Sequence, residues 1–286
     1  MSSSRFDDVA QRWVPGEGPV DVLPLADGLV NRTCRVVRAG RVYSLRIAAS
    51  AGRELGLDRR WECAVRARAG AAGLAPPVHR CDPEGGILIA DWASGRAWSA
   101  QETRLPGNID LMARLLRRVH ALEIPAPPRR MHPGDWIALY QSALTPRGPA
   151  AGLRSAAEAC LAQLARLPGS APVLCHSDLH RANLLIGADP LLLDWEFAHV
   201  SDGLWDLGGW VANNDWTDDE AQRLLSGYLQ RPAGAPELER LGIWAWLYDY
   251  VCLLWSECYL DGRRGTTHPV IAARADVLAT RLARPR

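Results

Sequence analysis

The segment formed by residues 173–206 constrains the fold more than any other part of the chain. It contains two short apolar runs, residues 184–186 and 191–193, separated by a turn that includes glycine and proline. Short apolar runs with such breakers between them predict the two strands of a hairpin. Because a hairpin fixes the positions of its end residues, Asn183 before the first strand and Asp194 after the second are expected to lie close together.

Three oxygen-bearing side chains in this segment predict chemistry with a metal ion. Mg²⁺ prefers oxygen ligands in octahedral geometry and takes about one or two of them from the protein. Asn183 and Asp194 supply an amide and a carboxylate oxygen, which leaves Asp178, in the loop before the hairpin, available to accept a proton. The spacing D-x-x-x-x-N, followed by an aspartate on the next strand, is typical of phosphoryl transfer in kinases. We therefore assign the metal to Asn183 and Asp194 and the role of catalytic base to Asp178.

Two other interpretations of this segment remain open from the residues alone. His176, Asp178 and His180 lie two positions apart and offer imidazole and carboxylate ligands, which also suit Zn²⁺. No third histidine or cysteine follows at ligand spacing, which disfavours zinc. A purely structural hairpin explains the glycine and the proline, but it does not explain the three placed oxygen groups.

Composition excludes several classes of partner. The chain has 286 residues, enough for two units of ordinary domain size. Its 33 basic residues, all of them arginine, nearly balance 32 acidic ones, so the net charge is +1. Such a balance predicts neither nucleic acid nor an anionic membrane as a partner. Scattered arginine pairs, including the pair that begins at Arg59, are expected to face solvent.

The cysteines and the hydropathy predict a cytoplasmic protein. Seven widely spaced cysteines form no C-x-x-C pair, so we expect reduced thiols. The serine-rich start of the chain lacks the apolar region of a signal peptide. The most apolar stretch, residues 243–255, is too short to span a membrane and contains Asp249. The cysteines in question are Cys34, Cys63, Cys81, Cys160, Cys175, Cys252 and Cys258.

The first part of the chain predicts a small sheet with one helix. Residues 20–25, 33–38 and 42–47 have the composition of strands in an antiparallel meander. The first turn, residues 26–32, offers a glycine and backbone amides for phosphates but lacks the G-x-G-x-x-G run of protein kinases. Residues 58–73 predict a helix that ends at a glycine before two prolines.

Charged side chains on these elements predict a nucleotide site. Arg46, at the end of the third strand, is placed to reach phosphates where kinases use lysine. Glu62, on the helix, is its expected partner; Glu54 competes for that role, and a solvated Glu62 is the simpler interpretation. Residues 87–92 predict another strand, and we assign its Asp91 to the same nucleotide site. Residues 93–95 then form a hinge, so the expected lobes are residues 1–92 and 93–286.

The second lobe is predicted to be mainly helical. Its last long helix carries many aromatic residues around more than one face, which predicts burial on several sides. Core packing explains most of these rings. A sharper hypothesis is a pocket for an organic cation, because ammonium groups are attracted to ring faces and carboxylates. The residues assigned to that pocket are Trp244, Tyr248, Asp249 and Trp255.

Three motifs resemble a known family. Residues 176–183, HSDLHRAN, and residues 193–196, LDWE, are similar to the H-x-D-x-x-x-x-N and I-D-W/Y-E segments of the aminoglycoside phosphotransferase and choline kinase family. Residues 205–207, WDL, resemble the later aspartate motif of that family, whose carboxylate braces the catalytic loop. The pair Trp195-Glu196 is more similar to choline, ethanolamine and thiamine kinases than to antibiotic-modifying members.

The resemblance implies a fold and an activity. The fold is α+β, protein-kinase-like and two-lobed, with a small N-terminal lobe of antiparallel sheet and one helix and a larger helical C-terminal lobe. The activity is transfer of phosphate from ATP, with Mg²⁺, to a small and cationic alcohol such as choline, ethanolamine or thiamine. An aminoglycoside acceptor and a regulator without turnover are the alternatives. Asn31 then belongs to the nucleotide site and Glu196 to the substrate site.

Overall fold

The computed structural model describes residues 3–25, 30–48, 55–144, 148–261 and 268–283. Within them, the chain divides into two compact units. Unit 1 comprises residues 1–98, 122–127 and 181–198, and unit 2 comprises residues 99–121, 128–180 and 199–286. The boundary expected after residue 92 is a single cut, whereas this division places the 181–198 hairpin with the N-terminal sheet. Contacts between distant segments, which sequence order does not reveal, account for that difference.

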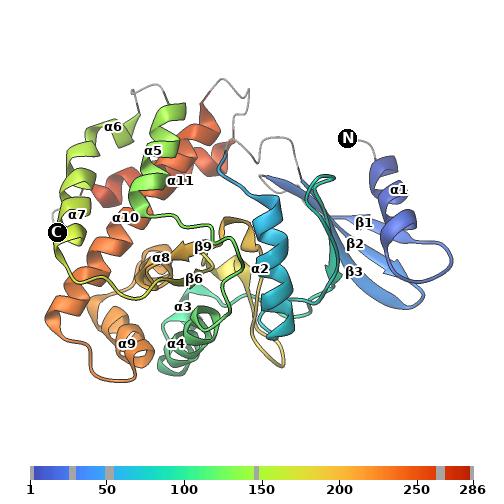
Figure 1. Cartoon of the computed structure of the whole chain (residues 1–286), viewed down its shortest axis with the longest axis horizontal. Coiled ribbons are helices and arrows are strands. Elements are labelled where there is room, and N and C mark those ends of the chain that lie inside the picture. Colours follow the sequence, from blue (N-terminus) through green and yellow to red (C-terminus); the bar gives the residue numbers. More distant parts are fainter. Residues whose placement is uncertain (1–2, 26–29, 49–54, 145–147, 262–267, 284–286) are drawn as a thin grey trace. The chain divides into compact units, whose positions relative to one another are not determined.

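Unit 1 is built on a five-stranded antiparallel sheet in the order β1-β2-β3-β5-β4. The strands are β1 (Asp21–Pro24), β2 (Asn31–Arg38), β3 (Arg41–Ala48), β4 (Val78–Asp82) and β5 (Ile87–Asp91). Helices α1 (Ser3–Trp13) and α2 (Arg59–Ala71) lie on opposite sides of the sheet (Figure 1). The sequence analysis found α2 and four of the strands but gave neither α1 nor β4.

Alternation along β3 decides which residues face which helix. Tyr43, Leu45 and Ile47 are buried in a cluster with Phe6 and Ala10 of α1. Successive side chains of a strand point to opposite faces, so Arg46 faces the side of α2. The apolar face therefore anchors the sheet, while the other face carries the charged residues of the candidate site.

The hairpin predicted from the sequence is present in unit 1. Its strands are β7 (Leu184–Leu185) and β8 (Leu191–Leu192), preceded by the 3-10 turn η2 (Arg181–Asn183) and followed by the 3-10 turn η3 (Trp195–Phe197). The chain after β5 pairs with this hairpin through Arg96 and Ile186. Gly95 has φ +156°, and an added Cβ would lie 2.9 Å from the Ile186 oxygen, so this close approach requires glycine.

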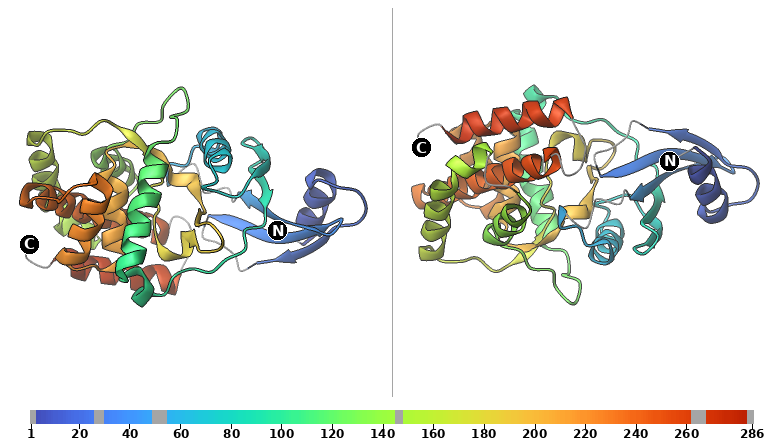
Figure 2. Two further views of the ribbon diagram at one scale, coloured as in Figure 1. Left: turned by 90° about the horizontal axis from the view of Figure 1, so that it is seen from below. Right: turned by 90° about the horizontal axis from the view of Figure 1, so that it is seen from above.

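Unit 2 is mainly helical. The long helix α10 (Ala235–Leu260) packs against α8 (Leu204–Asn214) and α11 (Pro269–Leu282), and Figure 2 shows α10 and α11 side by side. Strands β6 (Val173–Cys175) and β9 (His199–Ser201) pair antiparallel. The helices are α3 (Ala100–Thr103), α4 (Pro106–His120), α5 (Pro133–Ala143), α6 (Pro149–Gly152), α7 (Arg154–Arg166), α8 (Leu204–Asn214), α9 (Asp218–Leu229), α10 (Ala235–Leu260) and α11 (Pro269–Leu282).

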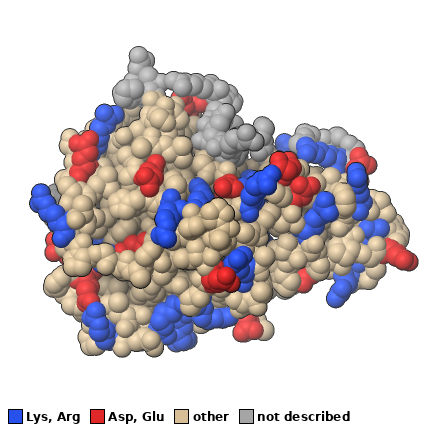
Figure 3. Space-filling model, viewed as in Figure 1, with Lys and Arg blue, Asp and Glu red and all other residues tan. Residues whose placement is uncertain are grey.

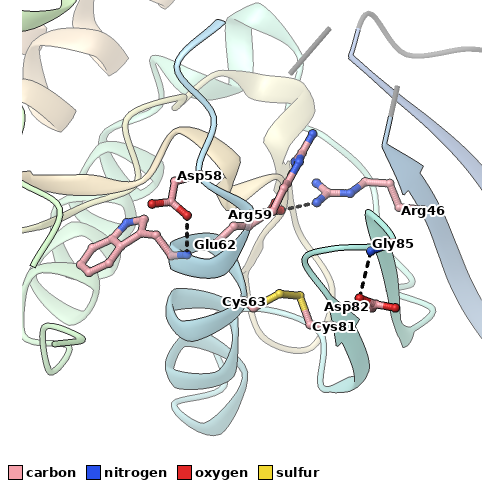
Figure 4. Close-up of a disulfide and its surroundings, with 9 residues drawn as sticks. Arg46, Asp58, Arg59, Glu62, Cys63, Cys81, Asp82 and Gly85 are labelled. Atoms are coloured by element: carbon pink, nitrogen blue, oxygen red, sulfur yellow. Dashed lines mark hydrogen bonds and ion pairs between the residues drawn. A yellow bond between two sulfur atoms is a disulfide. The ribbon is translucent and has the colours of Figure 1, made fainter. Parts of the chain in front are cut away.

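One expectation about the cysteines is wrong. Cys63 of α2 and Cys81 of β4 form a disulfide, with Cα atoms 5.6 Å apart (Figure 4). The packing of α2 beside β4 brings them together, and a separation of 18 residues gives no hint of it. The other five cysteines are free thiols.

The surface charge and the hydropathy of the helices add two observations. On the face shown in Figure 3, basic and acidic residues are interspersed, in keeping with the balanced net charge. Among the residues that the structure describes, no helix is both long and apolar enough to cross a membrane.

Candidate active site

The hairpin of unit 1 places Asn183 and Asp194 at the same end. Leu184 pairs with Leu192, and the Leu193 N–H donates to the Asn183 carbonyl oxygen at 2.8 Å. Asp194 comes next, in the left-handed conformation with φ 57° and ψ 66°, which is uncommon outside glycine. The sharp turn leaves the side chain of Asp194 37% exposed. The carboxylate is therefore held by a short hairpin and remains accessible.

The residues around Asp194 anchor this turn in the interior of unit 1. Trp195 is fully buried, and its indole Nε1–H donates to the Leu192 oxygen at 3.0 Å. Trp61 of α2 donates from Nε1 to the Ala198 oxygen at 2.7 Å. Because both ends of η3 are tied, the position of Asp194 is set by packing as well as by the hairpin.

Arg46 connects α2 and the hairpin. Its NH2 donates to Glu62, and its NH1 lies 3.0 Å from Asp194 Oδ1. Burial by itself lowers the pKa of Arg46, but Glu62, Glu196 and Asp194 outweigh it and raise the pKa above its ordinary value. Burial likewise raises the pKa of Glu62, but Arg46 and Arg59 hold it below the ordinary value. Arg46 is therefore cationic and Glu62 anionic near neutral pH.

A second guanidinium, that of Arg59, completes the charge network. Its NH1 lies 2.7 Å from Glu62 Oε2 and 2.8 Å from Glu196 Oε2, and its NH2 donates to Asn31 Oδ1 at 2.8 Å. Asn31 Nδ2 in turn donates to Glu196 Oε2 at 2.7 Å. Burial and the nearby Asp194 raise the pKa of Glu196 to about 7, although Arg46 and Arg59 oppose the rise. The structure thus places Asn31 and Glu196 in one network with Glu62.

The sequence analysis missed the role of Arg59. Its expectation of a solvated arginine is wrong, because the side chain is only 15% exposed and contacts two carboxylates. The one available signal was local: Arg59 precedes Glu62 by three positions, which places them on one helical face. Arg66, one turn after Glu62, is also buried, and burial lowers its pKa to about 10.

The donor atoms of unit 1 fit a hard divalent cation. An amide oxygen and a carboxylate oxygen at one hairpin end are the ligand types that Mg²⁺ takes from proteins. Oxygens of Glu62, Asp194 and Glu196 also lie within 4.8 Å of one another. The side chains of Glu62 and Glu196 are 1% and 4% exposed, whereas that of Asp194 is 37% exposed, so Asp194 is the carboxylate best placed to reach a metal. Asp91 is not one of these clustered carboxylates, and its Oδ1 lies 2.7 Å from His79 Nε2.

The loop that carries Asp178 belongs to unit 2 and begins directly after β6. Asp206, at the start of α8, accepts a hydrogen bond from the Ser177 N–H at 2.7 Å and another from the His176 N–H at 2.7 Å. Its Oδ2 also lies 3.1 Å from His120 Nε2. Ser177 has φ 72°, so the buried carboxylate stabilises a backbone conformation that few residues adopt.

Asp178 is poised as a carboxylate. Its side chain is 25% exposed, and Oδ2 lies 3.7 Å from His180 Nε2. Burial raises its pKa, but His180 and His176 outweigh burial and hold the pKa below the ordinary value. His176 Nδ1 accepts a hydrogen bond from the Asp178 N–H at 3.3 Å, so this ring atom stabilises the backbone of the loop. Among the described residues, His176, Asp178 and His180 do not gather their ligand atoms into a metal cluster.

The four residues assigned to a cation pocket have separate surroundings in unit 2. Trp244 and Tyr248 are nearly fully buried and pack against Trp205. Asp249 is buried and ion-paired with Arg281. Trp255 is half-buried and stacks on Tyr259 with ring centroids 5.4 Å apart. Asp249 does line a surface pocket between α8 and α10, together with Asp215, Trp216, Glu239, Trp246 and Arg281.

Comparisons with known proteins bear on the family and the fold of the chain. A model of the phosphotransferase enzyme family matches residues 21–244. The chain is similar to a choline/ethanolamine kinase family protein from Mesorhizobium loti at 23% identity and a TM-score of 0.77, over 98% of this chain and 93% of that chain. It is similar to choline kinase LicA from Streptococcus pneumoniae at 21% identity and a TM-score of 0.78, over 98% of both chains.

An antibiotic-modifying enzyme is among the similar structures as well. Macrolide 2'-phosphotransferase MphH from Brachybacterium faecium shares 17% identity with a TM-score of 0.65, over 99% of this chain and 98% of that chain. No curated protein matches the chain in sequence. These structural similarities confirm the predicted α+β, kinase-like fold class.

Proposed function

The chain belongs to the phosphotransferase enzyme family and is a small-molecule phosphotransferase, and we propose that it moves the γ-phosphate of ATP to the hydroxyl group of a small cationic alcohol. The hairpin of unit 1 is the observation that carries this proposal. It presents the Asp194 carboxylate beside the guanidinium of Arg46, at 3.0 Å, with Asn183 at the same hairpin end. Oxygen ligands next to a fixed cation suit a metal-bound polyphosphate.

In this proposal Asp178 accepts the proton of the acceptor hydroxyl. A general base must be ionised at the working pH, and the low pKa of Asp178 satisfies that condition. Asp206 sets the backbone before it by accepting the His176 and Ser177 N–H groups. A weak base suffices here, because the transferred phosphoryl group is loosely bonded in the transition state and needs little proton removal beforehand.

Asn183 and Asp194 would hold Mg²⁺, and Arg46 would contact the phosphates. When bound, the metal neutralises charge on the transferring group. Glu62 keeps the guanidinium of Arg46 oriented through a buried ion pair. Since this chain contains no lysine, Arg46 takes the place that kinases give to a lysine, and its planar fork can contact two oxygens at once.

Charge in the helical unit supports a cationic acceptor. The pocket between α8 and α10 is lined by Asp215, Glu239 and Asp249 against the single guanidinium of Arg281. The indole of Trp246 lines it too, and ring faces attract organic cations. The similar structures include a choline/ethanolamine kinase family protein and a choline kinase, in keeping with an amino alcohol as the acceptor.

A panel assay tests the proposal. ADP release would be measured with ATP and Mg²⁺ in the presence of choline, ethanolamine, thiamine, an amino sugar, an aminoglycoside and glycerol as an uncharged control. We expect stimulation by at least one cationic alcohol and a product heavier by one phosphate in mass spectrometry. Turnover of the aminoglycoside alone would change the acceptor class, and silence across the panel would contradict transfer to such alcohols.

A further inference from the structure

Arg59 occupies a defined position at the start of α2. Asp58 caps this helix, since its Oδ1 accepts the Trp61 N–H at 3.0 Å, and Arg59 is the first helical residue. The guanidinium extends toward the side chain of Arg46, as Figure 4 shows. A capped helix start fixes the backbone from which this long side chain reaches the charge network.

The contacts of Arg59 join three segments that are far apart in the sequence. It reaches Glu196, 137 positions away in the turn after the hairpin, and Asn31, 28 positions away at the start of β2. Asn31 closes the triangle by donating to the same Glu196 oxygen. One guanidinium therefore links α2, the start of β2 and the turn that carries Asp194.

Glu196 depends on this guanidinium. Its side chain is 4% exposed, and Arg46 is the next cation, with NH1 3.7 Å from Oε2. A buried carboxylate that loses its hydrogen-bonded cation is strongly destabilised, so removal of Arg59 would displace the Glu196 side chain from its present position. That displacement would move the η3 turn, which directly follows Asp194 in its left-handed conformation.

We infer that Arg59 is a positioning residue, which holds the turn at Asp194 in its metal-binding geometry through Glu196. Its second contact aligns Asn31 with the same Glu196 carboxylate. Its partners are Glu62, Glu196 and Asn31, so its effect on Asp194 is indirect. The inference rests on the role proposed above for Asp194. Glu196, which the sequence suggested for the acceptor, serves in this account to seat the metal carboxylate.

The variants follow from the geometry. Arg59→Met removes the charge and keeps the length, and Arg59→Lys keeps the charge but has one nitrogen, which cannot serve both carboxylates and Asn31. Glu196→Gln removes the carboxylate charge and keeps the shape. Arg60→Met is the matched control, because Arg60 is the next residue of the same helix and its partner Glu84 is 73% exposed.

The readout is Mg²⁺-dependent binding of ADP, measured by calorimetry, with thermal melting to verify folding. Loss of an outer-shell partner typically weakens metal binding by roughly 10- to 100-fold, and we expect that loss of Mg²⁺ dependence for Arg59→Met. Arg59→Lys should lie between it and the wild type, and Arg60→Met should match the wild type. Metal-free ADP binding should change less than the metal-dependent part.

The double variant separates positioning from general destabilisation. If Arg59 acts through Glu196, Arg59→Met combined with Glu196→Gln should bind no worse than Arg59→Met alone. Unchanged Mg²⁺ dependence in Arg59→Met, or full additivity in the double variant, would overturn the inference. If Arg59→Met fails to fold, Arg59→Lys decides in the same assay. A wild type that binds Mg²⁺ and ADP but transfers no phosphate would refute the proposed function and leave this inference standing.

Discussion

The Asp206 carboxylate holds the Ser177 N–H at 2.7 Å, across 29 positions of sequence, and so links the start of α8 to the loop before Asp178. The second oxygen holds the His176 N–H and faces His120. Asp206 itself is 1% exposed. The geometry of the candidate base thus depends on a carboxylate that would not contact substrate.

We predict that Asp206→Asn disrupts both activity and stability. The amide keeps one acceptor oxygen but turns an N–H₂ group toward a backbone N–H, which leaves buried donors unpaired. Removal of one partner from such a buried charged network costs about 3 kcal/mol, which urea unfolding would measure. Asp110→Asn is the control, because Asp110 forms an exposed pair with Arg223. Equal stability of the two variants would contradict the assigned role.

The lowered pKa of Asp206 also predicts how the stability of the protein depends on pH. Burial raises the pKa of Asp206, but His120 and the Ser177 N–H outweigh it and hold the pKa below its ordinary value. A carboxyl group with a depressed folded pKa contributes stability above its unfolded pKa, roughly pH 4, and loses it as the pH falls further. The unfolding free energy of the wild type should therefore decrease more steeply below that pH than that of Asp206→Asn. Parallel curves would refute the pKa shift.

Arg46 should be needed for nucleotide use. Removal of a preorganised cation aimed at developing charge costs roughly 100-fold in rate, and we expect that loss in kcat/KM for ATP in Arg46→Met. Arg46→Lys should retain part of the activity, because it keeps the positive charge. It should not restore full activity, since a point charge cannot contact Glu62 and Asp194 through separate nitrogens. Arg41→Met, at the exposed start of the same strand, should behave as wild type. Full activity in Arg46→Met would move the phosphate site elsewhere.

The disulfide between α2 and β4 gives a stability prediction. It closes a loop of 18 residues, and a cross-link of that size stabilises a fold by about 3 kcal/mol. Cys63→Ser should lower the melting temperature, and reductant should lower that of the wild type to a similar value. Reductant should leave the double variant with Cys63→Ser and Cys81→Ser unchanged. A wild type that is insensitive to reductant would show that the bond does not form in solution.

Local patterns made part of this molecule predictable. The hairpin that joins Asn183 to Asp194 depends on residues within a dozen positions, and apolar runs with a glycine-proline turn reveal it. The ion pair of Arg46 with Glu62 follows from strand alternation and helix position. A family motif strengthened both expectations, because its residues match in type and spacing.

Contacts between distant segments were not predictable in the same way. Arg59 reaches Glu196 only because α2 packs beside the η3 turn, and neither periodicity nor spacing encodes that packing. Cys63 meets Cys81 for a similar reason, although the wide spacing of the seven cysteines predicted reduced thiols. Trp244 and Tyr248 were assigned to a pocket by residue type, yet their rings pack in the core, where aromatic residues are equally common.

The most direct test of the account measures transfer and binding together in Asp178→Ala. ADP formation would be followed with ATP, Mg²⁺ and the preferred acceptor, and ADP affinity would be determined on the same preparation. We predict that acceptor-dependent turnover falls at least roughly 100-fold, the loss typical of a general base, while ADP binding stays near the wild-type value. Turnover close to that of the wild type would contradict the assignment of Asp178 as the catalytic base and, with it, the proposed mechanism.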